Sequence, residues 1–213
     1  MQELRALGAR SVPVVARGGA FAYAQVIGDV VDFLQLAEDA SPQLSPTELA
    51  ERFDGILETA IRLTRQMPDD QLERLLPRRP RSWREMMYHL FQIPNVFLDM
   101  EETGRTITRE ELNVLPPDDM RTSEPIALFG EGVRQRFNEW WSTAREESFD
   151  GDVPTYFGHT SRHEMLERTV WHSTQHVRQL ASLLEQAGVE PDRPLGQRDI
   201  EGLPLTERIW DDD

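Results

Sequence analysis

The chain of 213 residues contains no cysteine. This absence excludes disulfides, thiolate zinc sites, iron–sulfur clusters and a cysteine nucleophile. Basic residues are also scarce, since 23 Lys and Arg stand against 38 Asp and Glu and the net charge is −15. Nucleic acid and anionic lipid are held by clustered positive charge, so the composition argues against both as partners.

Long apolar runs are missing as well. No stretch approaches the length of a membrane span, and the N-terminal segment MQELRALGAR lacks the apolar core of a signal peptide. We therefore expect a cytoplasmic protein that does not enter a membrane. Hydrophobic residues still make up 38% of the chain, which is enough to form a sizeable core.

Residues 1–36 have a different pattern from the rest of the chain. The runs SVPVVARG, from Ser11, and AFAYAQV, from Ala20, meet at the Gly18-Gly19 pair, which predicts a β-hairpin. The following IGDVVDFLQL has apolar residues at helical spacing. The segment is therefore predicted to be a ββα unit. Because a unit of this size is too small to be stable alone, we expect it to pack on the rest of the chain or on a second subunit of a homodimer.

A polar linker, residues 37–44, leads into a helical domain, residues 45–213. Four long amphipathic segments are predicted to form helices, and each opens with serine: residues 45–67, 82–104, 123–147 and 161–188. The first, second and fourth also carry Glu three residues after that serine, which is the capping-box pattern. We expect Ser123 to cap the third helix and Pro94 to kink the second.

The order and spacing of these segments predict a mainly α-helical fold, a four-helix bundle with a small N-terminal ββα appendage. The connection between the second and third helices, residues 105–122, is long enough to cross the bundle. It therefore favours an up-down-down-up order. The tail after the fourth helix is predicted to be irregular, with Leu203, Leu205 and Trp210 anchoring it against the helices.

Three histidines form a candidate metal site. His172 and His176 lie four residues apart, so a helix presents both rings on one side. His89 falls at the edge of the apolar stripe of the second helix. If the two helices meet, three imidazoles with an open position suit zinc, nickel, cobalt, iron or manganese. The alternative is that these are ordinary hydrogen-bonded histidines, as we interpret His159 and His163.

Several polar side chains fall within a turn or two of these histidines. Gln179, Gln92 and Asn95 could orient the imidazoles or hold a substrate, or they could simply be solvated amides at helix edges. Gln175 lies nearer the outer face and is a poorer candidate. Arg178 could receive an anionic group of a substrate, or it could face solvent.

The segments SWREMMYHLFQI and EMLERTVWHSTQHVRQL make residues 45–187 resemble the DinB-like metal-binding helical bundles. In that family one histidine of the second helix and an HxxxH pair of the fourth hold a divalent metal. The resemblance assigns these roles to His89, His172 and His176. Zinc or nickel is the expected ion, with manganese, iron and cobalt as further candidates.

The N-terminal segment resembles another family. SVPVV and RGGAFAYAQVIGDVVDFL are similar to the C-terminal half of a glutaredoxin or thioredoxin fold, which places a cis proline at Val12–Pro13. The half that carries the cysteine motif is absent, so redox activity does not carry over. The unit could serve as a dimerisation element, or its strand could pair with a glutathione-like backbone.

Members of the DinB-like family include transferases that use bacillithiol or mycothiol. The resemblance therefore implies a metal-dependent transferase that activates a low-molecular-weight thiol, since an ion with three neutral ligands can deprotonate a bound thiol. Two alternatives remain open. One is a hydrolase that uses metal-bound water, and the other is a non-catalytic stress or binding protein that the metal braces.

Overall fold

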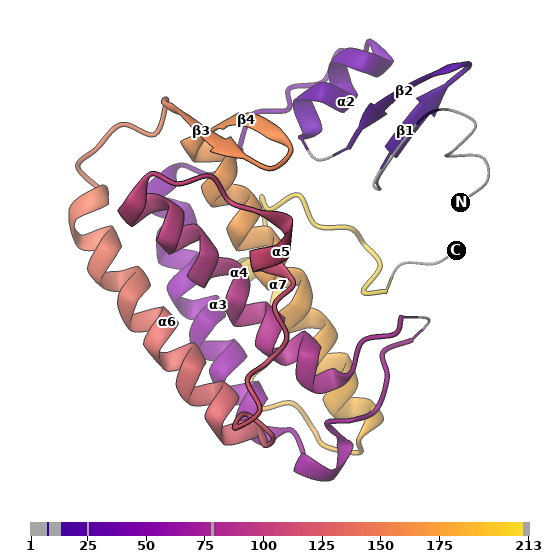
Figure 1. Cartoon of the computed structure of the whole chain (residues 1–213), viewed down its shortest axis with the longest axis vertical. Coiled ribbons are helices and arrows are strands. Elements are labelled where there is room, and N and C mark those ends of the chain that lie inside the picture. The colour runs from indigo at the N-terminus through magenta and orange to yellow at the C-terminus, as the bar shows by residue number, and fades with distance from the viewer. Residues whose placement is uncertain (1–7, 9–13, 25, 78, 211–213) are drawn as a thin grey trace. The chain divides into compact units, whose positions relative to one another are not determined.

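The computed structural model describes residue 8 and residues 14–24, 26–77 and 79–210. The chain is mainly helical, as its sequence predicts (Figure 1). It divides into two compact units, residues 1–42 and residues 43–213.

The first unit contains the ββα order expected for it. Strands β1 (Val14–Arg17) and β2 (Ala20–Tyr23) pair antiparallel through the two-glycine turn, and helix α2 (Ile27–Leu34) follows. Arg17 donates a hydrogen bond of 3.0 Å to the carbonyl of Leu34, which ties the end of α2 to β1. Strand β2 ends at Tyr23 and is shorter than predicted. The predicted cis bond at Val12–Pro13 lies outside the described residues.

The second unit is built on four long helices, and three of them begin as their sequences predict. Ser45, Ser82 and Ser161 each accept a hydrogen bond from the backbone of the glutamate three residues later, and that glutamate returns one. These boxes satisfy orphan N–H groups at the helix starts. The four helices are α3 (Pro46–Gln66), α4 (Trp83–Thr103), α6 (Ser123–Ala144) and α7 (Arg162–Gln186).

The predicted cap of α6 is wrong. Thr122 stands at the cap position without a side-chain cap bond, and Ser123 is the first helical residue. The backbone N–H and the hydroxyl of Ser123 both donate to Asp69 Oδ1, at 2.8 and 2.9 Å. Asp69 begins the 3₁₀ turn η1 (Asp69–Gln71), so a carboxylate distant in sequence satisfies the start of α6. The helix also ends at Ala144, earlier than expected.

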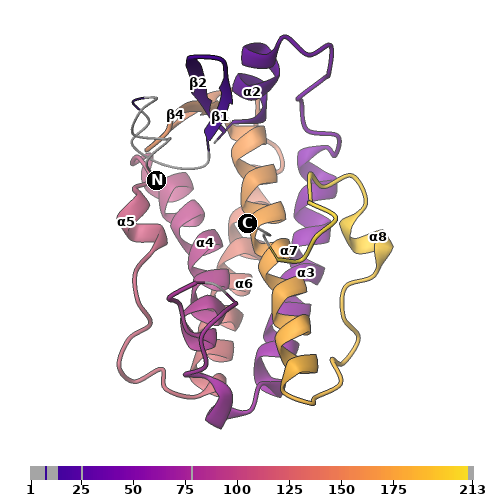
Figure 2. The same ribbon diagram turned by 90° about the vertical axis from the view of Figure 1, so that its right-hand side faces the viewer.

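Each long helix packs against two of the others, as Figure 1 and Figure 2 show. Helices α3 and α4 both contact α6 and α7. Apolar side chains fill the space between them, including the edge-on pair Phe53 and Phe137, whose ring centres lie 5.0 Å apart. Gly130 lets α6 approach α4 closely, because a Cβ at this position would lie 2.5 Å from the ring of Phe91. Burial of each large apolar side chain stabilises the fold by about 1.5–3 kcal/mol.

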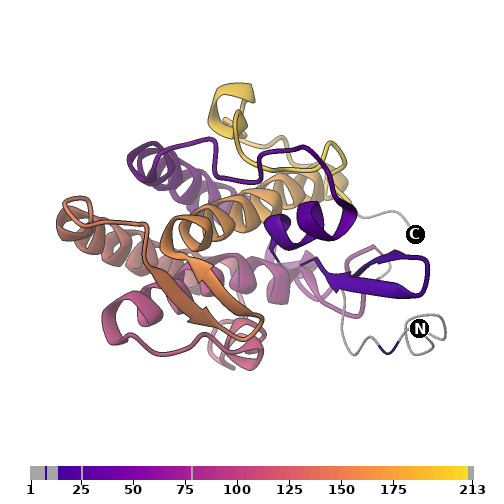
Figure 3. The same ribbon diagram turned by 90° about the horizontal axis from the view of Figure 1, so that it is seen from above.

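The connections contain short elements that the sequence analysis did not predict. They are α5 (Arg109–Leu112), β3 (Asp152–Thr155), β4 (Gly158–Ser161) and α8 (Gln197–Ile200). Strands β3 and β4 form an antiparallel hairpin, and β4 continues directly into α7, as Figure 3 shows. Ile107 forms a bridge with Thr155, which ties the segment before α5 to this hairpin.

The C-terminal tail lies against the helices. Leu203 is buried, and Leu205 and Trp210 are partly buried against the core. Within the described part of the chain, no helix combines the length and the apolar character that crossing a membrane would require.

Candidate metal centre

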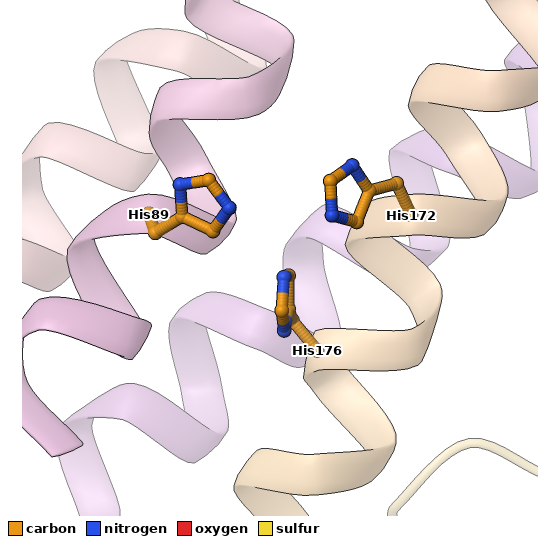
Figure 4. A group of neighbouring side chains, drawn as sticks. All are labelled: His89, His172 and His176. Carbon is orange, nitrogen blue, oxygen red and sulfur yellow. The ribbon is translucent and has the colours of Figure 1, made fainter. Parts of the chain in front are cut away.

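The structure brings together the three histidines that the sequence singles out. His89 comes from α4, while His172 and His176 come from α7, which packs against α4. Each offers one ring nitrogen, and these nitrogens lie within 4.8 Å of one another. Figure 4 shows the three rings turned toward a common point between the two helices.

The spacing of the three rings is compatible with their binding one metal ion. The ring centre of His89 lies 5.6 Å from that of His172 and 5.2 Å from that of His176, and the latter two are 5.0 Å apart. Zinc binds imidazole at about 2.0–2.1 Å, which puts ligand nitrogens about 3.4 Å apart in a tetrahedral site. The nitrogens here lie within 4.8 Å of one another, so they would move closer together around an ion. The group could therefore hold a divalent metal ion.

Burial differs among the three rings. His89 and His176 are each 7% exposed, and His172 is half-buried. Burial holds the pKa of both His89 and His172 well below its usual range, and the neighbouring His176 adds to this effect. A low pKa keeps an imidazole neutral, which is the form that binds a metal.

A backbone carbonyl orients His89. Its Nδ1 lies 2.6 Å from the carbonyl oxygen of Leu112, at the end of α5. An oxygen acceptor at this distance requires a proton on Nδ1, so Nε2 carries the lone pair. The connection between α4 and α6 therefore selects the tautomer that leaves Nε2 of His89 able to bind an ion.

A side-chain amide orients His176 in the same way. Nδ1 of His176 lies 2.7 Å from Oε1 of Gln179, and Nε2 of Gln179 donates to the carbonyl of Ile209 at 3.0 Å. The carbonyl can only accept, so it fixes which end of the amide faces the ring. His176 must then donate from Nδ1, and its Nε2 carries the lone pair. The C-terminal tail thus acts on a candidate metal ligand through one glutamine.

The other polar candidates make different contacts. Gln92 donates to the carbonyl of Glu111 at 3.0 Å, next to the carbonyl that orients His89, so it secures the same segment. Asn95 accepts a hydrogen bond of 2.9 Å from Arg136 of α6, an interaction between helices that involves no histidine.

Gln175 and Arg178 both hold the C-terminal tail. Gln175 donates to the carbonyl of Ile209 at 2.7 Å, and Arg178 donates to the carbonyls of Thr206 and Glu207 at 2.8 and 3.1 Å. Together with Gln179, they line one side of α7 along which the tail runs.

Of the remaining two histidines, His163 makes a different contact. Nε2 of His163 is 2.8 Å from the carbonyl of Leu44, at the start of the helical unit. His159 belongs to β4.

Sequence reasoning missed two groups of residues that act on the candidate ligands. The carbonyls of Leu112 and Ile209 could not be predicted, because every residue has a backbone carbonyl whatever its side chain. Arg81 and Arg168 are the other group, because their charges also lower the pKa of His172. Arg168 could have been found, since it stands four residues before His172 on the same helix face.

No protein-family model matches this sequence, and no curated protein matches it. Fold and site together define a mainly helical protein with a cluster of three histidines that could hold a divalent metal ion.

Proposed function

We propose that His89, His172 and His176 hold one divalent metal ion and that the protein uses it to activate a low-molecular-weight thiol for transfer to an electrophile. The observation that carries this proposal is the donor set, which consists of three converging imidazoles, two of them oriented through Nδ1. Zinc or nickel suits such a set best, and manganese, iron and cobalt are compatible with it.

The residues of the chain would bind the ion and orient the ligands. Leu112 and Gln179 fix the tautomers of two rings, and His172 is the least buried of the three. A bound divalent ion would supply the positive charge that favours a thiolate at neutral pH. Because the chain contains no cysteine, the thiol must come with the substrate.

The proposal extends to the family. We propose that residues 45–187 are a DinB-like bundle of the up-down-down-up type. Two observations support it: α3 and α4 each pack between α6 and α7, and the ligands come from the second and fourth long helices. The N-terminal unit is proposed to be a dimerisation element, because its hairpin and short helix are too small for a core of their own.

A non-catalytic role for the metal is the second candidate, and one observation favours it. The residues that orient the ligands belong to two connecting segments, at Leu112 and Ile209, so an ion at the histidines would also fasten both segments to the helices. If the metal only braces the structure, its removal costs stability, and external thiols leave its coordination unchanged.

Cobalt substitution separates the two candidates. Thiolate ligation to cobalt gives a strong near-ultraviolet charge-transfer band. We expect this band when the cobalt-loaded full chain is titrated with glutathione, cysteine, mycothiol or bacillithiol, together with accelerated conjugation of a chlorinated aromatic or an epoxide. A loaded protein that gives neither the band nor the acceleration with any of the four thiols contradicts the thiol proposal.

A further inference from the structure

The end of the C-terminal tail, residues 204–210, forms a strap along α7 (Figure 2). Side chains on one side of the helix hold the strap by its backbone carbonyls. The hydrogen bonds are 2.7–3.3 Å long and are donated by Gln175, Arg178 and Gln179 to the carbonyls of Thr206, Glu207, Arg208 and Ile209. The strap is therefore attached to α7 mainly by polar contacts.

Apolar burial contributes little to holding the strap. Among the described residues of the tail, Leu203 is the last that is buried, and in the strap itself Leu205 and Trp210 are only partly buried. A hydrogen bond contributes about 0.5–1.5 kcal/mol net. Segments with few apolar contacts open more readily than the core. The gain or loss of one hydrogen bond therefore changes the fraction of time for which the strap is docked.

The amide of Gln179 can take two orientations, and they act oppositely on the strap. In the structure, its Oε1 accepts from Nδ1 of His176, and its Nε2 donates to the carbonyl of Ile209. In the reverse orientation, the amide nitrogen would donate to an unprotonated Nδ1, and the amide oxygen would face the carbonyl, which is also an acceptor. The tautomer of His176 therefore decides whether Gln179 donates to the strap.

Metal binding by His176 would select the orientation that holds the strap. When the ring binds an ion through Nε2, its proton must stay on Nδ1. Oε1 of Gln179 then faces the ring, and the amide nitrogen faces Ile209. A neutral imidazole that binds no ion can carry its proton on either nitrogen, so both orientations of the amide become available. The strap then loses one donor for part of the time.

We propose that docking of the strap depends on whether the three histidines hold their metal ion, and that the amide of Gln179 couples the two events. The proposal rests on the proposed function in that it requires the ion, but it requires no thiol. Such a coupling is reciprocal, so the docked strap strengthens metal binding by the same factor, typically about 5–150-fold. The strap thus signals at the surface whether the ion is bound.

Limited proteolysis of the full chain with trypsin tests this coupling. Trypsin cleaves after arginine, and the bond after Arg208 lies in the strap, so its cleavage rate follows the undocked fraction. Cleavage after Arg145, which is exposed at the end of α6, is the internal reference for any effect of zinc on trypsin or on the whole fold. We expect zinc to slow cleavage after Arg208, relative to cleavage after Arg145, at least about fivefold. Mass spectrometry of the fragments measures both rates.

Variants of two glutamines test the role of the amide. Gln179→Glu keeps an acceptor for Nδ1 of His176 but cannot donate to Ile209, so it should load zinc without gaining protection after Arg208. Gln179→Ala at saturating zinc should also gain none. Gln175→Ala is the matched control, because it removes another donor to the same carbonyl. Its strap should be cleaved faster with and without zinc, and zinc should still slow the cleavage at least about fivefold.

The outcomes separate this inference from the proposed function. If zinc loads but the relative cleavage rate does not change, the coupling is wrong and the metal site stands. The coupling is also wrong if either Gln179 variant, folded by circular dichroism and loaded with zinc, is protected as the original protein is. Protection by zinc together with a failed thiol titration refutes thiol activation alone. Failure to load any metal refutes both.

Discussion

Oε1 of Gln179 lies 2.7 Å from Nδ1 of His176, while the amide nitrogen of the same glutamine donates to the carbonyl of Ile209. One side chain therefore connects the C-terminal tail to a candidate metal ligand. The tail fixes the amide, the amide fixes the tautomer, and the tautomer leaves Nε2 of His176 to bind an ion.

Replacing Gln179 should weaken metal binding without removing any ligand. In Gln179→Ala, His176 loses the acceptor that selects its tautomer, so the affinity for zinc should fall about 10–100-fold. Competition with a chromophoric chelator measures this affinity. Gln175→Ala is the matched control, since Gln175 donates to the same carbonyl of Ile209 and the hydrogen bonds described for its side chain include no histidine. An equal loss of zinc affinity in both variants would show that the tail affects metal binding only by stabilising the fold, and not by orienting His176.

Metal should stabilise the folded protein through the histidines. An ion that binds only the folded state adds about 2.7 kcal/mol at a concentration 100 times its Kd, so thermal unfolding should shift upward on adding zinc. His172→Ala should abolish most of this shift. His163→Ala, a histidine of the same helix that contacts Leu44 instead, should retain it. A zinc-induced shift that survives His172→Ala would place the ion elsewhere.

Two glycines of α6 should respond oppositely to alanine. A Cβ at Gly130 would lie 2.5 Å from the ring of Phe91, so Gly130→Ala should destabilise the protein by about 1–3 kcal/mol. A Cβ at Gly132 meets no atom within 4 Å, so Gly132→Ala should stabilise it by about 0.5–1 kcal/mol. Denaturant unfolding measures both changes. Equal effects would mean that the two helices do not approach each other at Gly130.

Glu167 should make stability depend on pH. Burial, with the nearby charge of Glu164, raises the pKa of Glu167 from 4.5 to about 7. The folded state thus holds this proton more tightly than the unfolded state. Its contribution to stability is fully present below about pH 4.5 and is lost as the pH rises through about 7.

Glu167→Gln fixes the neutral form and should remove this dependence. The variant should exceed the original protein in free energy of unfolding by about 2 kcal/mol near pH 8 and match it near pH 4.5. Denaturant unfolding across this range is the measurement. Glu185→Gln, at an exposed position of the same helix, should leave the pH profile unchanged. If the free energy of unfolding of Glu167→Gln depends on pH in the same way as that of the original protein, the raised pKa of Glu167 is contradicted.

The parts of the fold that the sequence predicts correctly are local ones. The capping boxes at Ser45, Ser82 and Ser161 involve residues three apart, so their pattern can be read directly. The cap of α6 could not be predicted, because Asp69 supplies it from a distant turn. The β3–β4 hairpin was missed because each strand is only four residues long and contains a residue that is disfavoured in strands, Pro154 in β3 and Gly158 in β4.

In the candidate site, too, local features could be predicted and contacts between distant segments could not. The spacing of His172 and His176 and the inward position of His89 could be inferred from helical periodicity. The contacts that orient the rings could not, because they depend on backbone carbonyls of a connection and a tail. Even Gln179, which the sequence does single out, acquires its role only through Ile209, whose position depends on how the tail folds back along α7.

The presence of a metal ion at the three histidines is the central claim, and elemental analysis of untagged protein tests it most directly. We expect about one equivalent of a divalent metal in the full chain, either as purified or after zinc or nickel is added, and a loss of most of it in His172→Ala. A content under about a tenth of an equivalent, with no uptake from added zinc or nickel, would contradict the account.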